Sequence, residues 1–412
     1  MTRRLIGLLL GTEEDWPRAF EHLIGRLGPV TYRGERYDVS SERITIEPFD
    51  LRARPRYSLV IDRLAYWYHV PREWLKKIAL MNDVYLLNNP FTFQAMEKHS
   101  AYCAMIRLGL KVPKTWLIPH KQPPDNPRFP YTAAKYNLPF DLAEIAERIS
   151  YPLYMKPFDG GQWVGVTRIG DPDELQTRYD ESGRRLMHLQ QAIEGYDVFA
   201  RSLSIGPDTM VMHFDPGRPM HLRYEVRHDF FSPAVGEEVV SVAQLVNAFF
   251  RWEFNSCETI VRGDEVYPID YANASPDVAL TSLHYYFPWA MRALVRWCVF
   301  CAVSGRRMRV DQDVRRYFEI GDRTDLDYRE KLAGYRRLSD EHFQAGEFWE
   351  FCATELSHLD ELTVEFVEGP ELDRIVVDSV VSTFPPHEHE ELIAHYRGLL
   401  AAWARDQHAA VR

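Results

Sequence analysis

The clearest chemical signal in the sequence is a lysine followed closely by two glycines. Lys156 ends one apolar run, Gly160 and Gly161 follow it, and a second apolar run opens at Val164. This order predicts a strand, a glycine-rich turn and another strand. A fixed positive charge would then lie beside free backbone N–H groups, an arrangement that suits phosphate. The alternative is a tight hairpin turn with a solvated lysine at the strand's edge, since the Walker pattern is absent here.

A second signal is a pair of acidic residues that flank a predicted hairpin. Gly263-Asp264 separates two apolar runs, with Glu258 near the start of the first run and Asp270 near the end of the second. In an antiparallel pair these two ends are neighbours, and Asn273 follows just beyond. Two carboxylates in one place suit Mg²⁺, with Mn²⁺ as the other occupant considered. The alternative is two solvated acids at strand ends.

Three regions of different pattern must position these residues. Residues 1–118 alternate strand and helix patterns, which predicts an α/β domain with a parallel sheet. Residues 119–282 are mostly strands with inserted helices, which predicts an α+β domain with antiparallel sheets. Residues 283–412 have helical periodicity, which predicts a mostly helical C-terminal region.

Several elements within these regions can be assigned more closely. Helices are expected over residues 91–110 and 239–254, and a strand over residues 222–227. The stretch 119–139 is polar and rich in proline, so it is expected to be a loop.

Bulk properties exclude several classes of protein. The formal net charge of -11 argues against a nucleic-acid binder, which needs a basic face. There is no run of about 18 apolar residues, so we expect no membrane span. The five cysteines are scattered, and Cys298-x-x-Cys301 lies in an apolar helical run. These features predict a cytoplasmic protein with reduced cysteines.

The order of the motifs resembles that of the ATP-grasp superfamily, with the RimK-like and glutathione-synthetase-like ligases nearest in character. The resemblance covers about residues 1–280. It begins at Asn88-Asn89-Pro90 and Lys98, where Glu97 stands in place of the family's usual aspartate. The Lys156 loop, the segment 190–197 and the acidic hairpin follow in the family's order. The resemblance implies an N-terminal pre-ATP-grasp α/β domain, a two-lobed ATP-grasp domain and a helical C-terminal extension.

The resemblance also implies a role for each nucleotide-binding position. Lys98 and Lys156 would contact the α- and β-phosphates of ATP, and Gly160 and Gly161 would belong to the loop that covers the phosphates. Residues 160–164 would form a moving lid. The adenine edge and the ribose would be contacted by Gln190, Gln191, Ile193 and Asp197.

The metal positions carry one departure from the family pattern. Glu258 and Asp270 would bridge one or two Mg²⁺ ions, and Asn273 would complete the set. The family usually ends this motif with Glu-x-Asn, but here one extra residue separates Asp270 from Asn273. In a regular strand that residue would turn the asparagine to the other face, and a bulge could restore it.

The activity implied is that of an ATP-dependent carboxylate–amine (or thiol) ligase that works through an acyl phosphate. Arg201, Arg223 and Arg227, all on predicted strands, are candidates to hold the acceptor carboxylate and the developing charge. The partners would be small-molecule or peptide substrates. Two alternatives stay open: a kinase for a small-molecule hydroxyl, and a nucleotide-binding module without turnover. The helical region could serve either as a cap on the acceptor site or as a surface for homo-oligomers.

Overall fold

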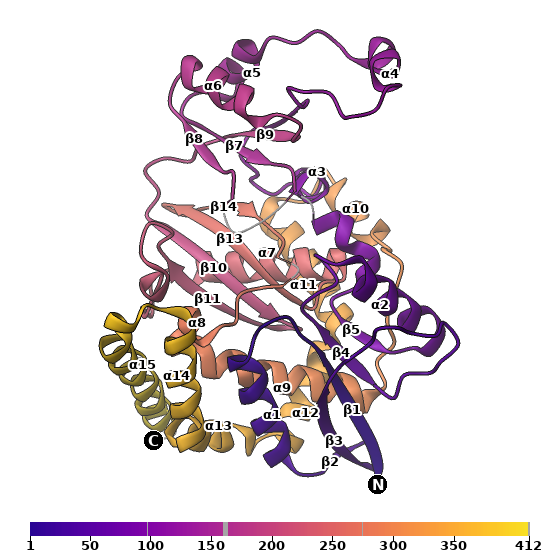
Figure 1. Ribbon diagram of the computed structural model, residues 1–412, viewed down its shortest axis with the longest axis vertical. Helices are drawn as coiled ribbons and strands as arrows, with labels where there is room; N and C mark the ends of the chain where they lie inside the picture. The colour runs from indigo at the N-terminus through magenta and orange to yellow at the C-terminus, as the bar shows by residue number, and fades with distance from the viewer. Residues whose placement is uncertain (97, 160–163, 274, 411–412) are drawn as a thin grey trace.

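The computed structural model describes residues 1–96, 98–159, 164–273 and 275–410, and these ranges form three β-sheets and a set of helices (Figure 1). No helix in these ranges is both long enough and apolar enough to cross a bilayer.

The N-terminal sheet is mixed and has the strand order β2-β3-β1-β4-β5. Its parallel strands are β1 (Thr2–Leu9), β3 (Glu35–Arg43), β4 (Leu59–Asp62) and β5 (Tyr85–Leu87), and β2 (Val30–Tyr32) runs antiparallel to β3. The sheet is parallel as predicted except at the β2 edge, which is antiparallel. The associated helices are α1 (Asp15–Leu27), α2 (His69–Asn82) and α3 (Lys98–Arg107), with a 3₁₀ turn at Pro90–Met96.

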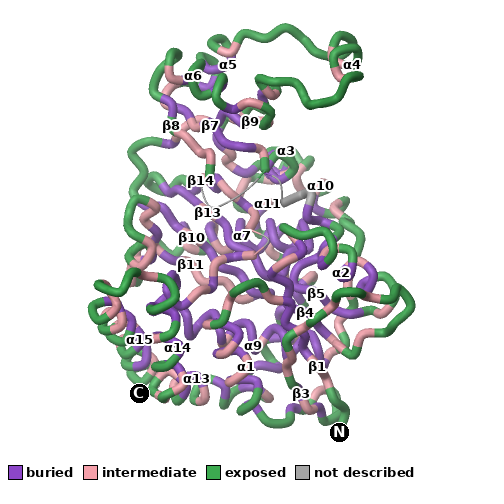
Figure 2. The backbone as a smooth tube through the Cα atoms, viewed as in Figure 1, coloured by how far each residue is buried: buried purple, intermediate pink, exposed green. Residues whose placement is uncertain are grey.

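A second, antiparallel sheet forms a separate lobe and has the order β6-β9-β7-β8. Its strands are β6 (Thr115–Ile118), β9 (Met187–Gln191), β7 (Leu153–Pro157) and β8 (Thr167–Ile169). Helices α5 (Leu142–Ile149) and α6 (Pro172–Ser182) pack on this sheet around a small core of their own. Helix α4 (Phe129–Tyr136) projects from the lobe, and none of its residues is buried (Figure 2).

The third sheet is antiparallel and has the order β12-β11-β10-β13-β14. Its strands are β10 (Val198–Ile205), β11 (Asp208–Phe214), β12 (Tyr224–Glu225), β13 (Phe254–Arg262) and β14 (Glu265–Asp270). Helix α7 (Pro233–Phe250) covers one face, where its Val235 and Val239 pack against Ala200 and Val261. Because side chains alternate along a strand, residues out of step with Ala200 lie on the opposite face.

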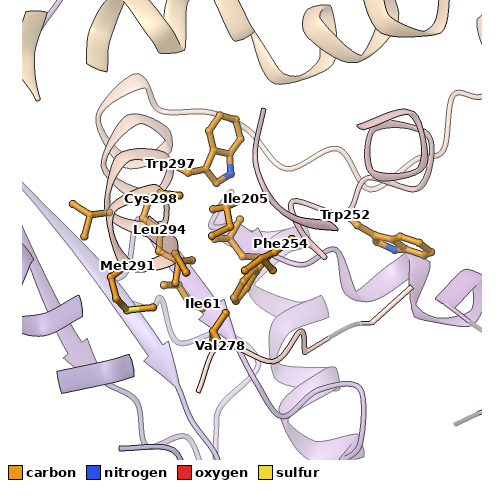
Figure 3. Close-up of a cluster of buried hydrophobic side chains, with 14 of the residues drawn as sticks. Ile61, Ile205, Trp252, Phe254, Val278, Met291, Leu294, Trp297 and Cys298 are labelled. Carbon is orange, nitrogen blue, oxygen red and sulfur yellow. The ribbon is translucent and has the colours of Figure 1, made fainter. Parts of the chain in front are cut away.

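The C-terminal helices pack back onto the first and third sheets. Helix α9 (Phe287–Ser304) contacts β1, β3, β4 and β10. In Figure 3, Met291, Leu294, Trp297 and Cys298 of α9 lie beside Ile61 of β4 and Ile205 of β10. The remaining helices are α8 (Leu280–Leu283), α10 (Arg315–Gly321), α11 (Tyr328–Phe343), α12 (Ala345–Glu355), α13 (Leu359–Glu368), α14 (Pro370–Thr383) and α15 (His389–Ala410), with 3₁₀ turns at Met220–Leu222, His284–Tyr286 and Pro386–Glu388.

The predicted fold class is confirmed: a mixed N-terminal sheet precedes two antiparallel sheets and a helical C-terminal region. The predicted domain boundaries stay a prediction. Three local expectations were wrong. Only Tyr224 and Glu225 of the expected strand 222–227 are extended, helix α4 interrupts the expected loop 119–139, and α7 begins at Pro233 and ends at Phe250, before the strand residue Phe254.

Candidate functional site

Three charged residues form a row across the third sheet. Arg201 of β10 is paired in register with Glu258 of β13, and Glu258 is paired with Asp270 of β14. Directly paired residues point to the same face, so the row lies opposite the face that α7 covers. The Nη2 atom of Arg201 lies 4.0 Å from Oε1 of Glu258, and its Nη1 donates a 3.1 Å hydrogen bond to the hydroxyl of Tyr224.

A bulge in β14 places the two carboxylates opposite each other. Thr259 pairs with Pro268, but the register shifts by one residue, so that Glu258 pairs with Asp270 and Ile269 is the extra residue. In an unbroken ladder Glu258 would face Ile269, and Asp270 would share the face of Pro268. The bulge therefore re-aims the Asp270 side chain toward Glu258. It lies before Asp270, not between Asp270 and Asn273.

Lys98 extends this row from a different part of the chain. It is the first residue of α3, and its Nζ lies 2.7 Å from Oδ2 of Asp270. Its backbone N–H also donates a 3.1 Å hydrogen bond to the carbonyl of Phe158, just after β7. One residue thus contacts both the third sheet and the lobe of the second sheet, and only 8% of its surface is exposed.

Lys156 reaches the same group of charges from the second sheet. Its Nζ donates a 2.7 Å hydrogen bond to Oε1 of Gln190, whose Nε2 donates to Oγ1 of Thr115 at 2.8 Å. The predicted strand that ends at Lys156 is confirmed, as β7. Lys156 interacts electrostatically with Lys98, Glu258 and Asp270, which joins the two lysines and the two acids in one cluster.

The pKa values in this cluster reflect burial opposed by ion pairing. Burial lowers the pKa of Lys156 to about 8, although Asp270 and Glu258 favour its charged form. Burial also disfavours the charge of Lys98, but Asp270 outweighs it and raises the pKa of the amine. Burial raises the pKa of Glu258 in spite of Arg201, whereas Lys98 overcomes burial and holds the pKa of Asp270 below its usual value. An added anion would therefore stabilise the charged form of Lys156.

The structure adds residues that the sequence analysis did not single out. His188 is paired with Lys156 across β7 and β9, and burial, His99 and the two site lysines lower its pKa to about 3. Tyr102 packs edge-on against His188 and donates to the carbonyl of Ile269 at 3.0 Å. Tyr102 lies four residues after Lys98, so helical spacing could have indicated it. Nothing in the sequence pointed to Tyr224.

The predicted adenine and ribose positions lie on and after β9, where the chain passes from the second sheet to the third. The side chain of Gln190 is hydrogen-bonded to Lys156 and Thr115, as described, and the backbone N–H of Gln191 donates to the carbonyl of Lys114. Within the described ranges, the N–H of Ile193 has no hydrogen-bond acceptor in the protein, which fits a backbone donor for a ligand. Oδ2 of Asp197 accepts a 2.7 Å hydrogen bond from Gly263 N–H, in the turn between β13 and β14.

Asn273, Arg223 and Arg227 are not brought into the charged row. Asn273 lies in the loop after β14, where its Oδ1 accepts from Ser275 N–H at 3.3 Å. Arg223 is exposed and donates to the carbonyl of Arg218. Arg227 is exposed and contacts His213, which is paired with Ala200 and therefore lies on the α7 face. Neither arginine is in a strand, contrary to expectation, and Arg201 is the one of the three that reaches Glu258.

The remaining expectations at the site concern residues that the structure does not describe, and the metal. Gly160, Gly161 and most of the expected lid 160–164 lie outside the described residues, as does Glu97. In the part of the chain that is described, no three His, Cys, Asp or Glu side chains group closely enough to hold a metal. The Glu258–Asp270 pair instead fits Mg²⁺ that takes its other ligands from substrate phosphates.

Comparison with known proteins gives matches to solved structures only; no family model and no curated protein matches. A RimK-domain ATP-grasp protein from Sphaerobacter thermophilus is 14% identical at TM-score 0.47, covering 71% of this chain and 97% of its own. D-alanine–D-alanine ligase from Bacillus anthracis, complexed with ATP, is 11% identical at TM-score 0.48, covering 84% and 99%. A RiPP-associated ATP-grasp ligase from Chryseobacterium gregarium, in complex with ADP and a leader and core peptide, is 14% identical at TM-score 0.48, covering 76% and 99%.

With TM-scores below 0.5, these likenesses say nothing about activity or substrate.

Proposed function

We propose that this protein is an ATP- and Mg²⁺-dependent ligase that joins a carboxylate to an amine or thiol. The observation that carries the proposal is the cluster of Lys98, Lys156, Glu258 and Asp270, which three separate segments bring together between two lobes. Cations for phosphate and carboxylates for a metal are the two kinds of group that phosphoryl transfer requires. All five cysteines are free, which suits a reducing cytoplasm.

The two lysines have different parts in this proposal. Lys98 is held by Asp270 and stays charged, so it is a fixed contact for phosphate oxygens. Lys156 is buried beside Gln190, and a phosphate would supply the counter-charge that its surroundings only partly provide. Bound between Glu258, Asp270 and the phosphates, Mg²⁺ would offset the charge of the transferred phosphoryl group.

Arg201 is the residue best placed to act on the acceptor. It is half-buried on the same sheet face as the two acids, and Tyr224 and Glu258 hold its guanidinium. A guanidinium there can orient an acceptor carboxylate, whose oxygen attacks the γ-phosphorus while ADP leaves. The nucleophile then attacks the acyl carbon of the mixed anhydride, and the products are the amide or thioester, phosphate and a proton.

Product analysis separates this ligase from a kinase and from a module without turnover. We expect ADP and inorganic phosphate to appear together when ATP, Mg²⁺, a carboxylic acid and an amine or thiol are supplied from acceptor libraries. Phosphate release should depend on the nucleophile, and the condensed product should be detectable by mass spectrometry. ADP with a stable phosphorylated hydroxyl product would instead support the kinase. Failure to bind nucleotide in the presence of Mg²⁺ would rule out all three functions.

Two substitutions connect the activity to the cluster. Lys156→Ala and Glu258→Ala should each abolish ATP turnover, because one removes a phosphate contact and the other a metal ligand. Lys135→Ala is the matched control, since Lys135 lies exposed on α4, and its turnover should equal that of the parent protein. Circular dichroism should show all three variants folded. Turnover retained in Lys156→Ala or Glu258→Ala would contradict the site assignment.

A further inference from the structure

A cavity of about 460 Å³ lies away from the charged row, where the N-terminal sheet meets the helical region. Its walls come from Tyr32 of β2, Tyr85 of β5, the connection between α7 and β13, the segment after α9, and helices α10 and α11. None of the described residues assigned above to the candidate site lines it. Its size lies within the range of small-molecule sites in proteins.

The lining of this cavity is unusually basic for this chain. Six arginines and three acidic residues line it, whereas the whole protein has a formal net charge of -11. A positive cavity in a negative protein attracts anions locally while the molecule as a whole repels them. The six are Arg33, Arg251, Arg306, Arg307, Arg309 and Arg316.

Two of the acids are already engaged by particular arginines. Glu253 is buried, with its Oε1 3.5 Å from Nη2 of Arg306, and the pKa of its carboxyl is lowered to about 2 as Arg306 overcomes the opposing effect of burial. Glu341 accepts a hydrogen bond from each of two nitrogens of Arg316, one of them at 2.9 Å. The other guanidinium groups of the cavity are not paired with these two acids.

Two of those groups, Arg251 and Arg307, have no carboxylate within ion-pair distance among the described residues, and a third, Arg309, has only a long ion pair. Arg251 is only 4% exposed; its Nη1 donates to the carbonyl of Ala248 at 2.8 Å and contacts Nδ1 of His342 at 3.2 Å, and its Nη2 donates to the carbonyl of Asp313 at 3.5 Å. No acid in the described ranges lies within ion-pair distance of it, and its buried Nε has no partner. Arg307 likewise has no acidic partner among the residues described, and Arg309 reaches Asp311 only at 3.9 Å. A buried guanidinium without a counter-charge is costly, and an anionic ligand would remove that cost.

We propose that this arginine cavity is a binding site for a small polyanion that carries phosphate or carboxylate groups. Arg251 supplies a buried guanidinium with an unpartnered Nε for one anionic group, and Arg307 and Arg309 supply further cations at the exposed side. Tyr85 and Tyr317 supply flat aromatic walls for the body of the ligand. The site is separate from the nucleotide cluster, so the proposal stands or fails independently of the ligase function.

Calorimetric titration of the full chain with pyrophosphate, and separately with citrate, tests the proposal. The double variant Arg307→Gln/Arg309→Gln should weaken binding about tenfold or more, because two charged contacts are lost. Arg405→Gln removes an exposed arginine on α15 and should change nothing. Lys156→Gln alters only the nucleotide cluster, so binding to the cavity should persist in it. The tighter of the two probes identifies phosphate or carboxylate as the preferred group.

A second variant addresses the buried arginine. Arg251→Lys keeps a positive charge but loses the planar fork, and it should also weaken binding, with a thermal midpoint measured to confirm folding. The proposal is overturned if neither probe binds at millimolar concentration, or if the double variant binds as tightly as the parent protein. It is also overturned if Lys156→Gln abolishes binding, because the probe would then occupy the nucleotide cluster.

Discussion

At the scale of single residues, the two acids of the site lie between two basic residues. Lys98, Asp270, Glu258 and Arg201 follow one another as cation, anion, anion and cation. Each acid thus has a basic partner on its outer side, while the space between the two acids is where a divalent cation would lie. This arrangement explains how two carboxylates can share one place in the protein before any metal binds.

If Lys156 binds phosphate as proposed, nucleotide binding should depend on pH. Since its pKa is lowered to about 8, the free protein loses this charge as the pH rises through that value. Phosphate binds the protonated amine, so affinity for a non-hydrolysable ATP analogue with Mg²⁺ should be constant below pH 8 and fall by up to about tenfold per pH unit above it. Calorimetry between pH 7.5 and 9.5 measures this. Lys156→Arg should remove the pH dependence, and a flat profile in the parent protein would contradict the assignment.

Arg201 and Arg227 provide a matched pair of substitutions. Arg201→Gln should lower ATP turnover about a hundredfold, because a half-buried guanidinium on the face of the two acids is removed. Arg227→Gln should leave turnover within about twofold, because Arg227 is exposed and contacts the α7 face. Initial rates with saturating acceptor measure both effects. Equal losses in the two variants would show that the strand row does not define the acceptor site.

The order of the motifs along the sequence was enough to single out the two lysines and the two acids as candidates, but it did not predict their contacts. Lys98 and Asp270 are separated by 172 positions, and no local pattern indicates that they form an ion pair. Counting outward from the hairpin turn predicts that Glu258 and Asp270 lie close together. The bulge residue Ile269 is evident only from the strand register in the structure. The same holds for Asp197, which the motif order singles out, while its contact with Gly263 depends on the turn that lies beside it.

At the scale of elements, the β10–β11 turn links the third sheet to α9. Gly206 has φ +57°, and a Cβ there would lie 2.3 Å from the ring of Trp297. Gly206→Ala should therefore lower the free energy of unfolding by about 2–4 kcal/mol, from backbone strain and the clash together. Gly263 has a similar φ of +59° with no neighbour near its Cβ position, so Gly263→Ala should cost only about 1 kcal/mol. Urea unfolding of both variants tests this; equal costs would mean that Trp297 adapts without penalty.

The elements that were predicted well have strong periodicity, and the others do not. In helix α5 the apolar residues recur at helical spacing and Asp141 caps the helix, so its local sequence agrees with its structure. Strand β3 has the sequence ERYDVSSER and was not expected, because a polar strand is formed by pairing with β1 rather than by its own composition. Helix α7 begins earlier than expected, although the cap Ser232 followed by Pro233 marks its start.

At the scale of the whole molecule, the helical region completes the core of the first and third sheets. All but three of the 18 residues of α9 are buried, and one continuous cluster of apolar side chains runs from Ile6 to Ala404. Ion pairs between Arg18 and both Glu371 and Asp378 join α1 to α14. Helical periodicity predicted the helices themselves, but not which sheets they cover, since a buried face does not specify its partner.

A chain that ends at residue 282 should therefore fail to form a stable monomer, because the removal of α9 exposes the apolar faces of β1, β4 and β10. We expect it to aggregate, or to unfold at least about 15 °C below the full chain by differential scanning fluorimetry. As a control, a chain in which residues 122–139 are replaced by a short Gly/Ser linker should keep its thermal midpoint, because no residue of that stretch is buried. A cooperative, stable 1–282 chain would support the predicted boundary at residue 282.

The most direct test of the proposed nucleotide site is a crystal structure with Mg²⁺ and a non-hydrolysable ATP analogue. The phosphates should lie within hydrogen-bond distance of Lys98 and Lys156, and the metal should be bound by Glu258 and Asp270. The adenine should meet the backbone near Ile193. A nucleotide bound elsewhere, or phosphates that contact neither lysine, would contradict the observation on which the proposed function rests.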